Sequence, residues 1–136
     1  MIEVKGTLYG TTVSGGANNK GTVFSITTSG ALQVLYSFKG RPDGEGPDAP
    51  LLAVGGKLYG TTFGGGANKK GTVFSITTSG TENVLFSFGA DDGNDPSGGL
   101  IDVGGALYGT TQQGGDHTDC QHPGRDGCGT VFALSL

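Results

Sequence analysis

One motif recurs three times in this chain and constrains its fold more than any other feature. LYGTT occupies Leu8–Thr12, Leu58–Thr62 and Leu107–Thr111, so successive copies begin 50 and 49 residues apart. A companion motif, GTVF, begins at Gly21, Gly71 and Gly129. Residues 6–38 and 56–88 align without a gap and differ at eight of 33 positions. A period near 50 residues indicates a fold built from repeated modules.

The repeats predict a single domain over residues 1–136. We place repeat 1 at 1–49, repeat 2 at 50–98 and repeat 3 at 99–136, the last without its final strand. Glycine makes up 29 of the 136 residues, and short β-branched and aromatic runs lie between turn residues. This composition predicts an all-β fold with many tight turns.

Repeat 2 shows the expected strands most completely. We predict strands over Leu51–Val54, Lys57–Phe63, Thr72–Thr78 and Asn83–Phe88, followed by a loop over Gly89–Gly99. Short connections between successive strands favour an antiparallel meander.

The predicted strands carry apolar side chains on both faces. Phe74 and Ile76 share one face, with Val73 opposite, and strict alternation puts Val84, Phe86 and Phe88 together with Leu85 opposite. A sheet that is apolar on both sides needs a neighbour on each side, and radial stacking of four-stranded blades supplies both. We therefore predict a β-propeller, with a β-trefoil or β-prism as the alternative.

The repeat count gives about three blades, whereas closed propellers use roughly four to eight. Three blades alone would leave apolar faces and strand edges open. We expect dimerisation to complete about six blades, and the alternative is that the chain is a fragment of a longer array.

The charge balance argues against two classes of partner. A net charge of −4 disfavours nucleic acid and anionic membranes. No run of about 20 apolar residues is present, so we expect no membrane insertion. We expect Lys20, Lys69 and Lys70 to be separate solvated charges that form no basic patch.

The combination of LYGTT, a glycine turn, GTVF, a terminal SF pair and a loop with Asp-Gly and Pro resembles the Gloeobacter–Verrucomicrobia type of bacterial tandem repeat. The resemblance covers nearly the whole chain and all three copies. It implies secreted or surface-anchored bacterial proteins with many repeats and no assigned activity, so we expect an extracellular or cell-surface location.

The candidate ligand residues fall in two groups. Tyr9, Tyr59 and Tyr108 repeat with the motif and suit stacking against a sugar, although a structural role for LYGTT explains them as well. The insert before the last GTVF adds His117, His122 and Arg125, the chain's most varied set of reactive side chains.

The insert also holds both cysteines. We predict a disulfide between Cys120 and Cys128, which suits an oxidising compartment. Free thiols are one alternative. A zinc site formed by these cysteines with the two histidines is another and is less favoured, because its spacing matches no usual pattern.

The loop of repeat 2 has the oxygen-rich look of calcium loops. Asp91, Asp92, Asn94 and Asp95 are the candidate ligands, and ordinary Asx turns are the alternative. We predict no other cofactor.

The sequence favours a non-enzymatic repeat scaffold or binding module for a glycan or protein. Near-identical copies supply symmetry, whereas a reaction centre needs different groups in different roles. We assign no catalytic residues. The alternatives are an extracytoplasmic polysaccharide hydrolase or lyase, and a purely structural propeller fragment.

Overall fold

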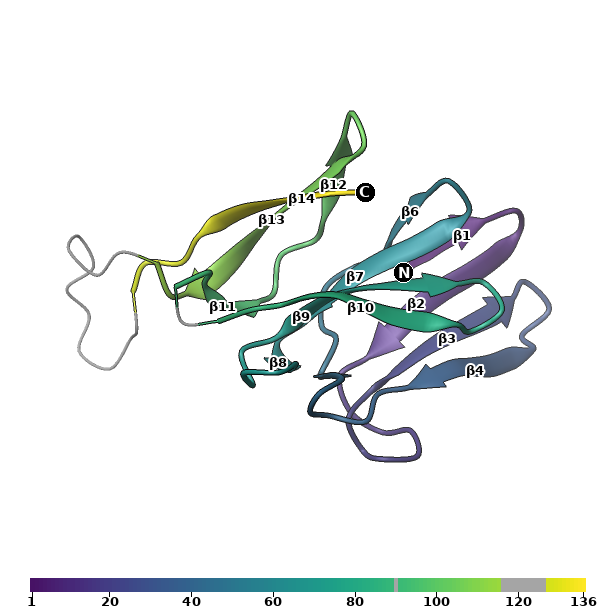
Figure 1. Ribbon diagram of the computed structural model, residues 1–136. Coiled ribbons are helices and arrows are strands. Elements are labelled where there is room, and N and C mark those ends of the chain that lie inside the picture. The colour runs from purple at the N-terminus through teal and green to yellow at the C-terminus, as the bar shows by residue number, and fades with distance from the viewer. Residues whose placement is uncertain (90, 116–126) are drawn as a thin grey trace.

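A computed structural model describes residues 1–89, 91–115 and 127–136 and shows strands and turns throughout that part of the chain. Three four-stranded antiparallel sheets follow one another along the sequence, and no helix occurs among the described residues (Figure 1). The prediction of an all-β fold built from four-stranded antiparallel sheets is confirmed. None of these sheets closes on itself.

Each repeat supplies the main strands of one sheet, which we number by its repeat. Sheet 1 contains β1 (Ile2–Val4), β2 (Thr7–Thr12), β3 (Thr22–Thr27) and β4 (Leu32–Ser37). Sheet 2 contains β6 (Leu52–Val54), β7 (Lys57–Thr62), β9 (Thr72–Thr77) and β10 (Glu82–Ser87). Sheet 3 contains β12 (Ile101–Val103), β13 (Ala106–Gln113) and β14 (Val131–Ser135), with β11 (Asn94–Pro96) paired to the far end of β13. Two residues of β5 (Gly44–Glu45) pair with β8 (Gly64–Gly65).

Sheet 2 is buried on both faces, as the sequence predicts. Its leading face, defined by Leu58, Phe74 and Ile76, packs against sheet 1 in a core that includes Tyr9, Val23 and Phe38. Its trailing face, defined by Tyr59, Val73 and Phe88, packs against sheet 3 in a second core that includes Leu100 and Leu107. Equivalent residues therefore build both interfaces.

An aromatic contact recurs in both cores. The Phe38 and Phe74 rings meet edge to face with centroids 5.1 Å apart, and Phe88 and Phe132 do the same at 4.9 Å. A second edge-to-face partner flanks each pair, namely Tyr36 beside Phe38 and Phe86 beside Phe88. Such pairs contribute roughly 0.5–1.5 kcal/mol beyond the area they bury.

The glycine of LYGTT makes room for the phenylalanine of GTVF. Gly60 pairs with Phe74 across β7 and β9, and a Cβ at Gly60 would lie 2.7 Å from Cζ of that ring. The same relation holds for Gly109 and Phe132, at 2.5 Å. A larger residue here would push the ring out of the interface, so the two motifs belong to one packing unit.

The last threonine of LYGTT ties the ends of two strands together. Oγ1 of Thr62 lies 2.8 Å from Oγ1 of Thr72, and Thr111 and Thr130 make the same contact at 2.9 Å. Thr12 and Thr22 repeat it at 2.8 Å. The Leu, Tyr, Gly and final Thr of the motif thus each have a packing or hydrogen-bonding role.

One expected orientation is wrong. Strict alternation places Val84 and Phe86 on the same face, but Val84 pairs with Phe74 and Phe86 pairs with Val73. A β-bulge between Val84 and Phe86 adds one residue to β10, so the two side chains lie on opposite faces. The bulge directs Phe86 toward sheet 3.

We expect Phe74→Ala to lower the free energy of unfolding by about 3–5 kcal/mol, because the ring is fully buried between two sheets. The matched control is Phe24→Ala, the same substitution at the equivalent, half-buried position on the uncovered face of sheet 1. Urea unfolding of both variants measures the difference. Equal losses would contradict the assignment of the inter-sheet core.

Candidate functional site

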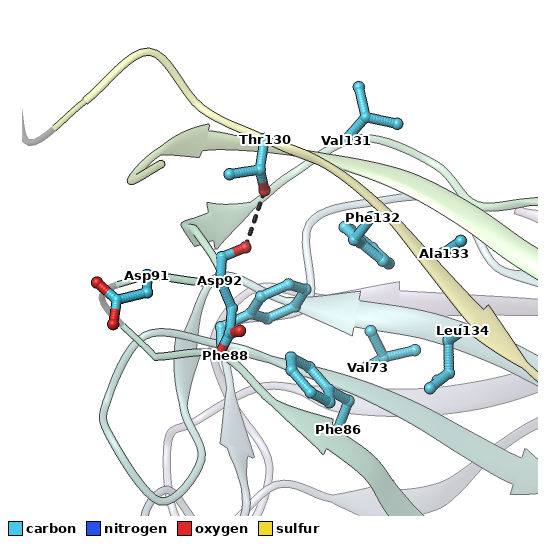
Figure 2. A pocket seen from close by; sticks show the side chains of 10 residues that line it. All are labelled: Val73, Phe86, Phe88, Asp91, Asp92, Thr130, Val131, Phe132, Ala133 and Leu134. Atoms are coloured by element: carbon cyan, nitrogen blue, oxygen red, sulfur yellow. Dashed lines mark hydrogen bonds between the residues drawn. The ribbon is translucent and has the colours of Figure 1, made fainter. Parts of the chain in front are cut away.

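A cleft lies between sheets 2 and 3, and we call it the interface cleft (Figure 2). Its volume is about 350 Å³. It is lined by Val73, Phe86, Phe88, Asp91, Asp92, Thr130, Val131, Phe132, Ala133 and Leu134. Five of these residues belong to β14 or directly precede it, so the cleft runs along one edge of sheet 3.

The interface cleft has an apolar body and one polar end. Phe86 and Phe88 of sheet 2 face Phe132 and Leu134 of β14 (Figure 2). At the polar end, Thr130 Oγ1 donates a hydrogen bond to the Asp92 carbonyl oxygen at 2.9 Å. Such a lining suits an apolar segment that ends in a polar turn, and it offers little to a strongly polar small molecule.

A second cleft, of about 270 Å³, gathers positive charge. It is lined by Lys20, Lys39, Gly40, Arg41, Glu45, Gly65 and Lys69, and we call it the cationic cleft. Lys20 Nζ lies 2.6 Å from Glu45 Oε2, which leaves three cationic side chains around one neutralised pair. The expectation that no basic patch forms is therefore wrong. Three separate segments contribute the charges, so no local sequence pattern reveals their proximity.

A cluster of acids and a tyrosine lies where β10 crosses sheet 1. Tyr36 Oη donates to Asp43 Oδ2 at 2.9 Å, and the backbone N–H groups of Lys39 and Gly44 also donate to the Asp43 carboxylate, at 2.9 and 2.7 Å. Glu82 of β10 approaches the same tyrosine. Asp43 is thus an organiser of the loop after β4, with its oxygens already engaged.

Burial at this crossing raises the pKa of Glu82 to about 7, and the nearby Asp43 charge adds to the effect. The Tyr36 hydroxyl and the Lys39 ammonium oppose it. Burial and the two carboxylates also raise the pKa of Tyr36. The second interface has Phe86 in place of Tyr36, so this polar crossing occurs once among the described residues.

The predicted tyrosines lie at unequal depths. Tyr9 and Tyr59 are each 8% exposed within the two inter-sheet cores, whereas Tyr108 is 38% exposed on the uncovered face of sheet 3. The structure does not bring the three rings together at one site. Tyr9 and Tyr59 present little ring surface for a sugar to stack on, and the ligand role of the three rings stays a prediction.

The predicted calcium ligands are distributed along one loop and serve different contacts. Asp92 Oδ2 accepts from the Gly89 N–H at 3.2 Å, and Asp95 Oδ2 accepts from Gln113 Nε2 at 2.9 Å. Asp91 is exposed, and Asn94 is buried with its Oδ1 unpartnered. In the first contact the aspartate accepts from a backbone N–H that precedes it in the chain, as Asp43 does from Lys39 in repeat 1. Calcium binding stays a prediction.

Most of the insert lies outside the described residues. This holds for His117, Cys120, His122 and Arg125, so the predicted ligand cluster, the zinc alternative and the disulfide with Cys128 stay predictions. Among the residues that are described, no three His, Cys, Asp or Glu side chains come close enough to hold a metal ion. The same part of the chain has no helix with the length and apolarity to cross a membrane.

Three open sheets joined by one recurring interface define a tandem-repeat protein of the all-β class. The chain belongs to the family of Gloeobacter/Verrucomicrobia repeats, whose family model matches residues 1–136. Comparisons with curated proteins and with solved structures found no match.

We expect the stability of the chain to fall as the pH rises from about 4.5 to about 7, through the contribution of Glu82. Its pKa is higher in the folded state than the usual 4.5, so over this range the folded state holds more protons than the unfolded state. Glu82→Gln should remove that slope and stabilise the chain at pH 8 by roughly 1 kcal/mol, a figure reduced for solvent screening.

Urea unfolding at pH 4 and pH 8 measures the effect. The control is Asp48→Asn, which neutralises an exposed carboxylate. A Glu82→Gln variant with the same pH dependence as the parent chain would contradict the assignment.

Proposed function

We propose that this chain is a non-enzymatic repeat scaffold, whose sheets stack through one recurring interface and which joins a second copy end to end through the same interface. The observation that carries the proposal is complementarity. The same interface forms between sheets 1 and 2 and between sheets 2 and 3. Its two halves are also present, uncovered, on the outer faces of sheets 1 and 3.

The trailing face of sheet 3 is one open half. Ile101, Val103, Tyr108 and Val131 are 59%, 57%, 38% and 78% exposed. The equivalent residues of sheet 2 pack against sheet 3, with Tyr59 and Val73 only 8% and 1% exposed. Contiguous apolar surface of this kind is typical of an interaction site.

The leading face of sheet 1 is the other open half. Leu8, Phe24 and Ile26 are half-buried, whereas their equivalents in sheet 2, which are Leu58, Phe74 and Ile76, are no more than 1% exposed. Sheet 1 therefore presents the residue types that sheets 2 and 3 already use against a preceding sheet. Placing sheet 3 of one copy before sheet 1 of another would repeat a contact that the chain makes twice.

Such a contact is heterologous, since different surfaces meet, and it forms a ring only where the rotation closes. Two copies would supply about six sheets, within the size range of closed β-propellers. The open faces support this arrangement over a trefoil or prism, whose apolar surface lies inside one chain. We place the scaffold outside the cytoplasm, in keeping with two cysteines in one short glycine-rich segment.

We expect a particle of twice the 13.6 kDa chain mass in solution. Val131→Glu and Leu8→Glu should each convert it to a monomer, because each places a charge in one half of the contact. Thr28→Glu, the same added charge on an exposed turn, should leave the dimer intact. Sedimentation equilibrium measures the mass, and circular dichroism checks the fold of each variant.

Mixing the two interface variants separates a heterologous contact from a symmetric one. A Val131→Glu chain and a Leu8→Glu chain retain one intact pair of faces between them, so the mixture should form a heterodimer while each variant alone stays monomeric. A parent chain that is monomeric at about 100 μM, or a mixture that does not associate, would contradict the proposal.

A second candidate function, binding of an acidic glycan, is favoured by the cationic cleft. Half of the eight Lys and Arg residues of a chain with net charge −4 line this one cleft. Guanidinium and ammonium groups are the usual partners of carboxylate and sulfate. A neutral sugar would gain no charge–charge attraction in this cleft and should not prefer it to the rest of the surface.

We expect polygalacturonate to bind the chain and dextran, a neutral polymer, to bind at least about tenfold more weakly. The double variant Arg41→Gln, Lys69→Asn should lose about tenfold in affinity. Lys5→Asn, Lys57→Gln is the matched control, since it makes the same charge change on exposed lysines and Lys5 shares the positive φ of Lys69.

Isothermal titration at two salt concentrations measures the affinities. Equal losses in both double variants would assign the binding to general charge. Release of shortened polysaccharide during the titration would favour the hydrolase or lyase alternative.

A further inference from the structure

We propose that sheet 3 accepts a fourth strand from another polypeptide: an extended segment with the pattern Leu-x-Val-Leu-aromatic-Ser-Phe pairs along the free edge of β14 and fills the interface cleft. This inference goes beyond the scaffold function, because it concerns a strand edge rather than a sheet face.

The edge of β14 is open in the part of the chain that the structure describes. β14 pairs with β13 along its whole length, from Val131 to Ser135. No described strand pairs with the other side of β14. The corresponding strand of sheet 1, β3, lies between β2 and β4. That of sheet 2, β9, lies between β7 and β10. An open edge presents unpaired N–H and C=O groups to an incoming strand.

The first interface shows what covers this position when a fourth strand is present. There the turn before β10 and β10 itself cross the trailing face of sheet 1, and a Cβ on Gly80 of that turn would lie 2.6 Å from the Leu35 carbonyl oxygen. Glu82 of β10 approaches Tyr36 at the same crossing. In the second interface the place equivalent to β10 is the interface cleft, and Phe86 lines it in place of Tyr36.

Side chains of β14 are less buried than the equivalent side chains of β9. A missing neighbouring strand predicts this difference. Phe74 and Ile76 of β9, beside β10, are 0% exposed. Phe132 and Leu134 occupy the same positions in β14 and are only half-buried, and both line the interface cleft. An incoming strand would remove the exposed parts of these two side chains from water.

The existing sheets fix the register of the incoming strand. Val34 pairs with Phe24 and Leu32 with Ile26 in sheet 1, as Val84 does with Phe74 in sheet 2. The incoming valine and leucine would therefore pair with Phe132 and Leu134.

A backbone hydrogen bond closes each existing fourth strand. The N–H groups of Phe38 and Phe88 donate to the carbonyl oxygens of Gly21 and Gly71, both at 3.0 Å. The Gly129 carbonyl holds the equivalent position for the terminal phenylalanine of the incoming strand.

The chemistry of the cleft also selects one residue of that strand. Where the trailing face carries Tyr36, the covering strand carries Glu82 beside its hydroxyl. The cleft carries Phe86 instead, which offers no hydrogen bond to a carboxylate. A leucine at that position, as in β4, suits the apolar lining, whereas a glutamate would be desolvated without a partner.

The test uses a synthetic peptide with the sequence of residues 29–39, SGALQVLYSFK, added to the full chain. We expect saturable binding, with backbone amides of Val131–Ser135 protected from hydrogen exchange. The control peptide differs only by glutamate at the position of Leu32 and should bind about tenfold more weakly at pH 8. The chain extended after Leu136 by residues 29–38 should also melt at a higher temperature than the parent.

Equal binding of the two peptides, or protection at the outer edges of β4 or β10 in place of β14, would overturn the proposal. So would an extended chain with an unchanged melting temperature together with absent peptide binding. The Val131→Glu and Leu8→Glu association experiment is read separately by mass, so either proposal can fail while the other holds.

Discussion

The structure depends on sheets that are apolar on both faces. A β-sheet with one wet face can end a protein, but sheet 2 places Phe74 and Ile76 on one side and Tyr59, Val73 and Phe88 on the other, all of them nearly or fully buried. Each face requires a neighbour, since exposing it would return the whole apolar surface to water. The stack of sheets follows from this requirement.

The repeated motifs provide the contacts through which neighbouring sheets cover these apolar faces. The phenylalanine of GTVF packs over the glycine of LYGTT. In this position its ring makes an edge-to-face contact with a phenylalanine ring of the previous repeat. Paired threonines hold the ends of the same strands together. The recurring motif is therefore the sequence counterpart of the recurring interface, and this explains why the five letters occur three times.

Sequence alone predicts the strands of repeat 2 closely, because β-branched runs mark the strands and glycine turns mark their ends. The burial of both faces also follows from the pattern. The bulge in β10 does not, since nothing in the letters VLFSF distinguishes a regular strand from one with an extra residue between Val84 and Phe86. The consequence is large, because the bulge turns Phe86 toward the interface cleft.

The same contrast holds for the candidate sites. The acidic loop is visible as a local run, yet its Asp92 serves a turn, as Asp43 does in repeat 1. The cationic cleft is assembled from residues in three segments, among them Lys20, Arg41 and Lys69, and only the packing of sheets 1 and 2 brings these together. Charges that converge through tertiary structure leave no spacing for a motif search to detect.

The near-identity of the repeats makes their few differences informative. Position 36 is tyrosine in repeat 1 and its equivalent, position 86, is phenylalanine in repeat 2. The strand that crosses Tyr36 brings Glu82, whereas the equivalent residue of β4 is Leu32, which is 63% exposed on the uncovered face of sheet 1. An acid matched to a hydroxyl and a leucine matched to an apolar ring would let otherwise interchangeable sheets distinguish their neighbours. A mismatch would bury a carboxylate against phenylalanine or leave a tyrosine hydroxyl with one acceptor fewer. Differences at these two positions would therefore bias the order in which such sheets stack.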